Sequence, residues 1–426
     1  MKNDKAEIIK IGIIGIGSMG KGLFYQSCIT PGIECVAVCD KDIERCKNVL
    51  EWLNLPYRIV ESLDALNSVI SQGIIALCDE GRWISAADCI NAVIEASNSI
   101  TLAAEYAITA LEHHKHVILM NSEIDLIYGP LLSNIAAENM VVCTSCDGDQ
   151  YGVMKHLVDD IVSWGFELVM VGNIKGFLDR YANPSTIIPE ADKRNLDYRM
   201  CTSYTDGTKL NIEMAIIANA YGLATLVPGM HGYPMDRVQQ VMNCYNFERL
   251  WDGRTPFVDY ILGAEPGGGV FTVGYCDNPY QKDMLSYYKM GNGPYYLFYR
   301  PYHLCHIEAM GTVFNAVLHN NCLLTPRCGL QTNVYAYAKR DLPAGFSLDG
   351  IGGYTCYGKI ENCAENKTHA GIPVCLAEDM VLKRPVMRDE RIGLEDVVFD
   401  STRADWRLYE KTLEQSKKVM MSRGIQ

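Results

Sequence analysis

Three glycines near the start of the chain have the spacing of a phosphate-binding turn. The sequence Gly15-Ile16-Gly17-Ser18-Met19-Gly20 lies between an apolar run, Ile8–Gly15, and a segment of helical character, Lys21–Ile29. The first glycine would permit a tight bend, the second would let a diphosphate approach the backbone, and the third would let helix and strand pack closely. Helix N-termini also attract anions through free N–H groups. We therefore expect a dinucleotide site that includes Ser18 and Met19; the alternative is a glycine-rich turn without a ligand.

An acidic residue, Asp40, closes the next apolar run, Ile33–Cys39. A carboxylate at this position accepts hydrogen bonds from a ribose 2′-hydroxyl and repels a 2′-phosphate, which favours NAD over NADP. Lys41 and Arg45 follow closely and could accommodate that phosphate, so NADP stays open. The nicotinamide end of the cofactor is expected beyond the carboxyl ends of further strands, where Ala96, Asn121 and Glu123 emerge.

A later segment is dense in charged side chains that suit work on a polar substrate. Lys209 and Glu213 are four residues apart, on one face of a helix expected from that point. A lysine beside a carbonyl polarises the oxygen and can pass it a proton. We expect Lys209 to be the acid/base or electrophile, Asp206 or Glu213 to be its partner, and Lys175 and Lys193 to clamp the substrate. The alternative is a solvated charged face with ordinary ion pairs.

Two cysteine and histidine motifs could suggest a metal or redox site, but other roles are favoured. His303 and His306 are three residues apart on an expected helix, His303–Val317, yet Glu308 is wrongly spaced to be a third ligand. We therefore predict no metal and favour hydrogen-bonded histidines in a core or dimer helix. Cys143 and Cys146 follow an apolar strand, and we expect packing thiols there.

A tyrosine-rich stretch precedes these histidines. Such density is typical of core and subunit contacts, although a sugar-stacking surface is an alternative. Arg300 could anchor an anion. The tyrosines are Tyr287, Tyr288, Tyr295, Tyr296, Tyr299 and Tyr302.

The order of the expected elements divides the chain into three regions. Strands and helices alternate over residues 1–146, which predicts an α/β doubly wound parallel sheet of the Rossmann type with right-handed crossovers. Residues 147–330 are expected to form a second domain, of α+β character. Residues 331–426 combine short β segments with a final amphipathic helix, Ser401–Met421, and predict a small β-rich domain.

The composition limits the classes of partner. The chain has 426 residues, 48% of them hydrophobic and 21% charged, which is typical of a globular protein of two or three domains. A net charge of -13 disfavours nucleic acid. No apolar run is long enough to span a membrane, and Met1–Lys10 has no apolar signal segment. The 17 cysteines have no repeating spacing, so we expect reduced thiols in a cytoplasmic protein.

Several motifs in a fixed order resemble one family of enzymes. The chain is similar to homoserine-dehydrogenase-like oxidoreductases that carry a C-terminal SAF (antifreeze-like) domain, a family that includes deoxyxylulose-phosphate-reductoisomerase-like enzymes. The resemblance covers nearly the full length. Besides the glycine turn, it is carried by the motifs at residues 93–96, 115–125, 147–150, 206–209, 301–306 and 338–342.

The resemblance implies hydride transfer between NAD(P)H and a small polar carbonyl or alcohol, such as a phosphorylated keto-sugar or a hydroxy acid. It also implies that residues 147–330 form the domain for catalysis and substrate binding. The same domain would build a homo-oligomer, a dimer or tetramer. Homoserine dehydrogenases usually have Asn-Lys where this chain has Asn121-Ser122, which argues against homoserine as the substrate. The alternatives are homoserine dehydrogenase itself and a non-catalytic NAD-binding module of a polysaccharide pathway.

Overall fold

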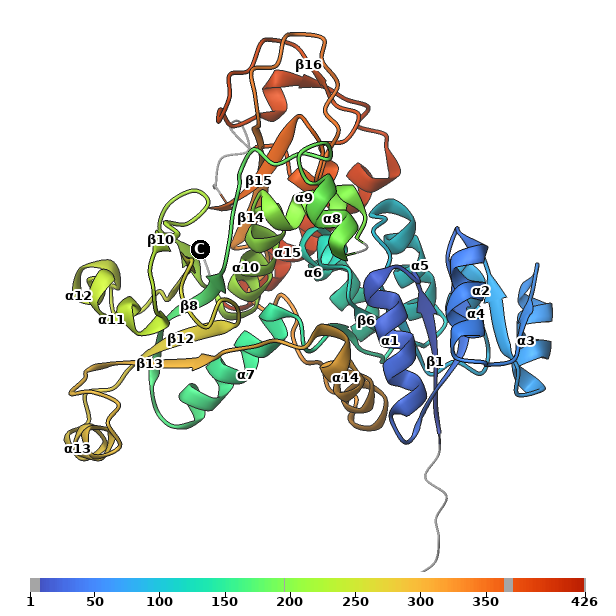
Figure 1. The fold of residues 1–426 in the computed structure, drawn as a ribbon, viewed down its shortest axis with the longest axis horizontal. Helices are drawn as coiled ribbons and strands as arrows, with labels where there is room; N and C mark the ends of the chain where they lie inside the picture. The colour runs from blue at the N-terminus through green and yellow to red at the C-terminus, as the bar shows by residue number, and fades with distance from the viewer. Residues whose placement is uncertain (1–7, 195, 364–370, 425–426) are drawn as a thin grey trace, which may run out of the picture. The chain divides into compact units, whose positions relative to one another are not determined.

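The computed structural model describes residues 8–194, 196–363 and 371–424, and the chain forms two compact units (Figure 1). The first consists of residues 1–149 and 304–325, and the second of residues 150–303 and 326–426. Most of the segment Met1–Lys10, where no signal was expected, lies outside the described residues. The three-domain division at residues 146 and 330 stays a prediction.

The first unit is built on a seven-stranded sheet in which every strand pair is parallel. The order is β3-β4-β2-β1-β5-β6-β7, so the chain reverses direction across the sheet between β1 and β5. In such sheets, ligands bind beyond the carboxyl ends of the strands at this reversal. The predicted α/β fold with a doubly wound parallel sheet is confirmed. The strands are β1 Ile9–Ile14, β2 Ile33–Cys39, β3 Tyr57–Ile59, β4 Ile75–Cys78, β5 Ala92–Glu95, β6 His116–Leu119 and β7 Cys143–Ser145.

The helices of this unit follow its strands, and two differences from the expected pattern have local causes. The region 57–86, for which no element was expected, contains short strands and helix α3, which begins where the Ser62 hydroxyl accepts the Ala65 N–H. The residue pattern predicts a helix over Gly129–Asn139, whereas α6 begins at Ser122, because the Asn121 side chain caps it there. The helices are α1 Ser18–Ile29, α2 Ile43–Trp52, α3 Leu63–Ser71, α4 Gly81–Ala86, α5 Thr101–Glu112, α6 Ser122–Glu138 and α14 Cys305–His319.

Helix α14 returns from far along the sequence to complete the first unit. It lies beside α1 (Figure 1), and its Met310 and Val313 join the core that contains Leu23 and Phe24. A Cβ on Gly22 of α1 would lie 2.6 Å from Cγ of His306, so the absence of a side chain at Gly22 makes room for that ring.

The second unit contains a mixed sheet of six strands. The order β10-β11-β8-β12-β13 joins parallel pairs on the β10–β8 side to antiparallel pairs at β12, and β9 pairs with β11. Tyr296 is buried, as expected for a core tyrosine, whereas Tyr287 and Tyr288 are 75% and 65% exposed beside helix α13, Pro279–Tyr287. The strands are β8 Glu167–Lys175, β9 Ala224–Thr225, β10 Tyr233–Pro234, β11 Phe257–Leu262, β12 Val270–Tyr275 and β13 Tyr295–Arg300.

Helices and two small hairpins complete this unit. Strands β14 (Thr332–Ala338) and β15 (Cys356–Asn362) form an antiparallel pair that contacts α10. Strands β16 (Val381–Leu382) and β17 (Val397–Val398) form a second antiparallel pair. The other helices are α7 Gln150–Ser163, α8 Ile188–Arg194, α9 Tyr198–Thr205, α10 Thr208–Tyr221, α11 Val241–Cys244, α12 Phe247–Leu250 and α15 Ala404–Ser422.

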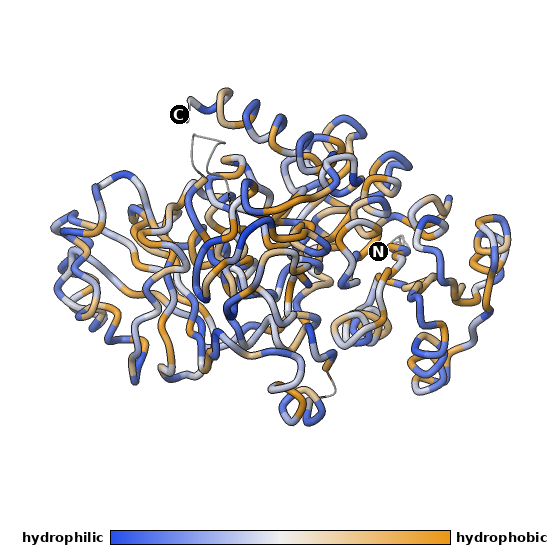
Figure 2. The backbone as a smooth tube through the Cα atoms, turned by 90° about the horizontal axis from the view of Figure 1, so that it is seen from above, coloured by the Kyte–Doolittle hydropathy of each residue, from blue (hydrophilic) through white to orange (hydrophobic). Residues whose placement is uncertain are grey.

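The final helix, α15, confirms the amphipathic pattern read from the sequence. Figure 2 shows hydrophilic and hydrophobic residues alternating along it next to the C-terminus. Trp406 and Tyr409 are buried, and the Tyr409 hydroxyl accepts a hydrogen bond of 3.0 Å from the Asn333 amide. Ser416 accepts the Leu330 N–H at 2.7 Å. The helix is therefore held by polar contacts as well as by burial.

Among the described residues, no helix combines the length and apolar character that crossing a bilayer would require.

A buried ion pair links distant parts of the second unit. Nζ of Lys339, just after β14, lies 2.8 Å from Oδ2 of Asp206, and both side chains are almost fully buried. The same ammonium donates to the carbonyls of Ala182 and Gly353, each at 2.7 Å. Burial raises the pKa of Asp206, while Lys339 and the Thr208 N–H oppose that rise. The carboxylate and the ammonium therefore depend on each other.

We expect Lys339→Met to destabilise the second unit by about 3–5 kcal/mol at neutral pH, because it leaves the Asp206 carboxylate buried without its cation. Denaturant unfolding measures this loss, with Lys411→Met, at an exposed position on α15, as the control that changes stability by less than about 0.5 kcal/mol. Replacing both partners, with Asp206→Leu added, should recover part of the loss. A Lys339→Met protein as stable as the control variant would contradict this account.

Candidate functional site

The first and third glycines of the turn are required by close backbone packing. Gly15 has φ +92°, and a Cβ there would lie 2.5 Å from the Ser97 nitrogen. A Cβ on Gly20 would lie 1.8 Å from the Gly15 carbonyl oxygen. Both distances are far below any real contact, so neither position accepts a larger residue without moving the backbone. The turn is thereby pressed against the loop that follows β5.

The second glycine has a different environment. Gly17 has φ -65°, which any residue can adopt, and a Cβ there would meet nothing within 4 Å. It is the N-cap of α1, and no side chain caps the helix there. The first-turn N–H groups, those of Ser18, Met19 and Gly20, are the ones that have no partner inside a helix. Neither backbone strain nor packing requires a glycine at this position, and the space beside it is open.

Asp40 organises the same turn. Its Oδ2 accepts the Ile16 N–H at 2.8 Å, and its Oδ1 accepts the Asp42 N–H at 3.0 Å. Each carboxylate oxygen has a second lone pair, so a ribose hydroxyl could still donate to it. Nη1 of Arg45 lies 3.5 Å from Oδ2 of Asp40 and is on a side chain that is 48% exposed. A carboxylate and a positively charged guanidinium therefore lie together beside the turn.

The loops after β5 and β6 are tied together where the sequence placed Ala96 and Asn121. Ala96 directly follows β5, and the Asn121 amide donates to the Ser99 carbonyl at 2.8 Å. Beneath them Glu95 is fully buried; its Oε1 accepts the Ser97 N–H at 3.1 Å. Burial raises the pKa of Glu95 to about 8. Among the described residues its Oε2 has no hydrogen-bond partner, so the group is held as a neutral acid at pH 7.

The motif at residues 206–209 forms the junction between α9 and α10. Gly207 adopts φ +88°, and Oδ1 of Asp206 accepts the Thr208 N–H at 2.8 Å. The Thr208 hydroxyl accepts the Gly358 N–H at 2.9 Å. These three residues thus shape the turn and join it to β15. Lys209 follows them in the first turn of α10.

The structure brings most of the predicted catalytic residues to this junction. Lys209 and Glu213 both lie on α10, as their four-residue spacing suggested, and both are buried, so they do not form the solvated charged face that was the alternative. Lys175, at the end of β8, donates to the Tyr204 carbonyl at 2.8 Å, two residues before Asp206. Lys193 lies exposed on α8, and no hydrogen bond found among the described residues joins it to the junction. The roles of these residues stay predictions.

A histidine and a buried carboxylate in the second unit were missed by the sequence analysis. Nδ1 of His231 lies 2.8 Å from Oδ2 of Asp259, which is fully buried in β11. Oδ1 of Asp259 accepts the N–H groups of His231, Gly232 and Tyr260 at 2.8–3.0 Å. The one available signal was an aspartate inside the apolar run Phe257–Leu262, a buried charge that must have partners.

A cluster of cations and tyrosines on β15 was also missed. Nζ of Lys359 lies 4.3 Å from the ring centre of Tyr337, and its stem packs against Gly229, where a Cβ would be 3.0 Å from Cγ. The guanidinium of Arg180 lies 5.6 Å from the ring of Tyr357, whose hydroxyl donates to Asp389 at 2.8 Å. Burial lowers the pKa of Lys359, and the nearby Arg180 adds to this. Residues far apart in sequence form the cluster, so no spacing reveals it.

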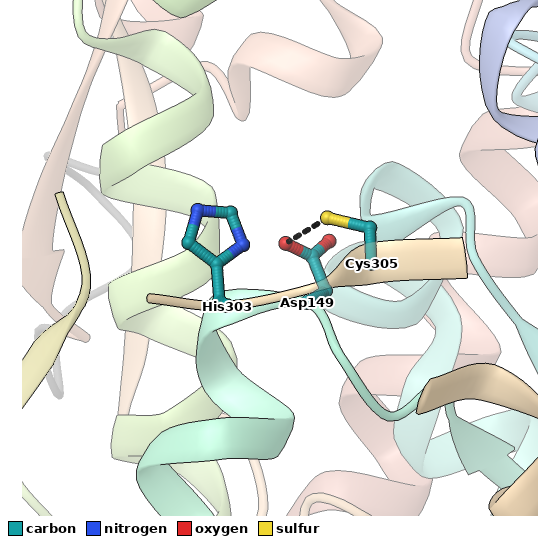
Figure 3. A group of neighbouring side chains, drawn as sticks. All are labelled: Asp149, His303 and Cys305. Carbon is teal, nitrogen blue, oxygen red and sulfur yellow. Dashed lines mark hydrogen bonds between the residues drawn. The ribbon is translucent and has the colours of Figure 1, made fainter. Parts of the chain in front are cut away.

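The histidine motif differs from its expected form. Helix α14 begins at Cys305, because its chain turns at Leu304, whose N–H donates to the Glu308 carboxylate at 3.1 Å. His303 therefore precedes the helix, and the expectation that it shares a helix face with His306 is wrong. In the first unit, the Cys305 thiol lies 4.0 Å from the Asp149 carboxylate (Figure 3). His303, also drawn there, is the last residue of the segment 150–303, which belongs to the second unit.

Cys143 and Cys146 are both buried, and burial raises the pKa of both thiols well above its ordinary value. A thiol that does not ionise is a poor nucleophile, which agrees with a packing role.

One family model matches part of the chain. Residues 148–309 match the family model described as "Oxidoreductase DRL, catalytic domain". A stretch of 61 residues, 14% of this chain, is 33% identical to Glycosyl hydrolase family 109 protein 4 of Phocaeicola vulgatus, and the match spans 12% of that relative. The predicted class of enzyme, an oxidoreductase, agrees with the family match.

Solved structures with a similar arrangement include dehydrogenases. One is described as a probable dehydrogenase from Thermotoga maritima, with 11% identity and a TM-score of 0.46, over 74% of this chain and 90% of that one. Another is a UDP-N-acetylglucosamine 3-dehydrogenase from Acidithiobacillus ferrooxidans, with 12% identity and a TM-score of 0.41, over 75% and 92% of the two chains.

The buried Glu95 predicts a specific dependence of stability on pH. Its pKa is about 8 when folded and about 4.3 in an unfolded chain. Between those values the folded protein holds one proton more, so this group's contribution is complete below the lower pKa and is lost as the pH rises through the upper one. Glu95→Gln, which cannot ionise, should therefore gain stability over the wild type by up to about 1.4 kcal/mol per pH unit in that window.

Denaturant unfolding between about pH 5 and pH 8 checks this expectation. Glu112→Gln, at the exposed end of α5, is the matched control and should show no such trend. A difference between Glu95→Gln and the wild type that stays constant over this range would show that Glu95 ionises normally.

Proposed function

We propose that this chain is an NAD(P)-dependent oxidoreductase that transfers a hydride between the nicotinamide and a small polar alcohol or carbonyl compound. A phosphorylated keto-sugar or a hydroxy acid fits the number of lysines in the second unit, because ammonium groups bind oxyanions through strong, charge-assisted hydrogen bonds. The family match at residues 148–309 supports the type of reaction.

The observation that carries this proposal is the opening at Gly17. Gly15 and Gly20 are fixed by backbone contacts, but Gly17 has an ordinary backbone conformation and free space beside the amides of α1. A diphosphate placed against those amides explains why a residue without a side chain stands there. The residues that would hold the cofactor are therefore Gly15 to Gly20 at the diphosphate, Asp40 and Arg45 at the adenosine ribose, and Ala96 and Asn121 towards the nicotinamide.

The cofactor, when bound, supplies the hydride donor or acceptor, and the protein must manage the substrate's oxygen and charge. In this proposal Lys209 polarises the oxygen or exchanges a proton with it, with Asp206 or Glu213 as its partner. Asp206 also forms a close ion pair with Lys339, and Glu213 lies one helical turn from Lys209 on α10. Lys175 and Lys193 are proposed to clamp the remainder of the substrate.

Finer assignments belong to the same proposal. Asp40 favours NAD over NADP, although Arg45 beside it could hold a 2′-phosphate. The homoserine-dehydrogenase-like relationship, the SAF-like nature of residues 331–426 and a homo-oligomer of two or four chains rest on the resemblance in the sequence. Every cysteine is a free thiol, which fits a reducing compartment such as the cytoplasm.

Gly17→Val provides the test of the cofactor site. Its backbone conformation suits valine, so the protein should fold, but the side chain would fill the space that the diphosphate needs. We expect the dissociation constant for NAD(H) or NADP(H), measured by titration calorimetry, to rise at least about tenfold, which corresponds to about 1.4 kcal/mol. Gly311→Ala, another open glycine in the same unit, is the control that should bind normally.

Failure of the wild type to bind either coenzyme would end the proposal. Coenzyme binding without turnover, across a panel of small polyols, hydroxy acids and sugar phosphates, would favour a binding module. Complementation of a homoserine auxotroph would instead assign homoserine as the substrate.

A further inference from the structure

The loop that carries His231 is fixed from several sides. Gly232 has φ +64°, and a Cβ there would lie 2.1 Å from Cζ of Tyr260, far closer than non-bonded atoms can approach. The His231 ring stacks on Tyr233, with ring centres 5.0 Å apart and planes 11° apart. The Asp259 carboxylate also accepts hydrogen bonds from the His231 and Gly232 N–H groups and contacts Nδ1 of the ring at 2.8 Å. These contacts therefore hold the imidazole in one orientation.

This arrangement decides which ring nitrogen carries the proton. A carboxylate only accepts, so Nδ1 of His231 must donate to Oδ2 of Asp259. In the neutral ring this leaves the lone pair on Nε2. Among the described residues no hydrogen bond to Nε2 is found, and the side chain is 23% exposed. A ring with one nitrogen fixed by a buried carboxylate and the other open is suited to accept a proton.

We propose that His231 is the proton acceptor for an alcohol substrate bound to the second unit, and that Asp259 is the residue that positions it. The proposal rests on the proposed oxidoreductase function and adds the group that handles the hydroxyl proton. Lys209 is then left with the electrophilic part of its predicted role.

The chemistry balances with the proposed coenzyme alone. As the alcohol is oxidised, its O–H bond breaks and the proton goes to Nε2 of His231. Its C–H bond breaks, and the hydrogen leaves with both bonding electrons as a hydride. The hydride reduces the oxidised nicotinamide while the C=O bond forms. In the reverse direction the imidazolium returns the proton to the oxygen. Asp259 stabilises the imidazolium by the hydrogen bond that already orients the ring.

Other groups around the ring do not offer an equivalent base. Tyr233, Tyr245 and Tyr260 are the tyrosines nearby, and burial raises the pKa of Tyr245 and Tyr260, so both stay protonated near neutral pH. Arg180 acts on Tyr260 as a fixed positive charge. Burial raises the pKa of Asp259, and the N–H groups of Gly232 and Tyr260 and the ring of His231 oppose that rise.

Two substitutions separate a proton acceptor from a structural histidine. His231→Asn keeps a donor for Asp259 but removes Nε2. Asp259→Asn can keep the three N–H bonds through its oxygen, while its amide donates to Nδ1 and moves the proton of His231 to Nε2. For the fastest substrate in the panel, both should lower kcat/KM about 10²–10⁴-fold and change its pH profile. Coenzyme affinity should not change. His319→Asn, at the exposed end of α14, is the control.

A second measurement does not need a substrate. Nitrogen-15 NMR of the histidine-labelled protein should show neutral His231 protonated at Nδ1 in the wild type and at Nε2 in Asp259→Asn. A wild-type ring protonated at Nε2, or a His231→Asn enzyme with full turnover and an unchanged pH profile, would overturn the proposal. A pH limb that disappears in Lys209→Met but persists in His231→Asn would assign the proton to Lys209. Loss of coenzyme binding in the wild type would instead refute the oxidoreductase function, while the tautomer would still be measured.

Discussion

The close approach of Gly15 to the segment after β5 is the constraint on which the first unit depends. It brings the end of β1 against Ala96 and Ser97, at the place where the strand order reverses. The same contact places the turn where Asp40 can accept the Ile16 N–H. Because backbone rather than side chains makes this contact, the geometry of the turn does not depend on rotamers. The amides at the start of α1 are thereby held in place, which favours the diphosphate site proposed above, because a preorganised site loses less entropy on binding.

The second unit contains several ionisable groups that are buried away from solvent. Asp206, Asp259 and Lys339 are buried, and each is held by several hydrogen bonds or an opposite charge. Such groups add little net stability, but they fix the arrangement of loops that regular secondary structure does not control. This suits the proposed role of the second unit, which is to orient a polar substrate.

Sequence reasoning recovered the parts of this molecule that are determined locally. The strand preceding Gly15, the final amphipathic helix and the position of Lys209 and Glu213 on one helix follow from spacing within a few residues. The region 57–86 was missed because its strands have only 3 and 4 residues, too few for a period to emerge.

The partners of charged residues could not be predicted for a different reason. Asp206 was paired with a neighbour in sequence, but the structure gives it Lys339, more than a hundred residues away. The pairing of His231 with Asp259 likewise depends on how β10 lies beside β11, which no local pattern encodes. The start of α14 at Cys305 depends on a single hydrogen bond, from Leu304 to Glu308. Local spacing therefore indicates where chemistry is possible, and long-range pairing decides which groups perform it.

The return of helix α14 to the first unit has a consequence for how the protein is made. Its Ala309, Met310 and Val313 cover core residues of α1 and the sheet, including Leu23 and Phe24. During synthesis on the ribosome, the amino-terminal 149 residues emerge long before this cover exists. The apolar residues that α14 covers therefore stay exposed while more than 150 further residues are translated. Exposed apolar surface of this kind is what chaperones bind.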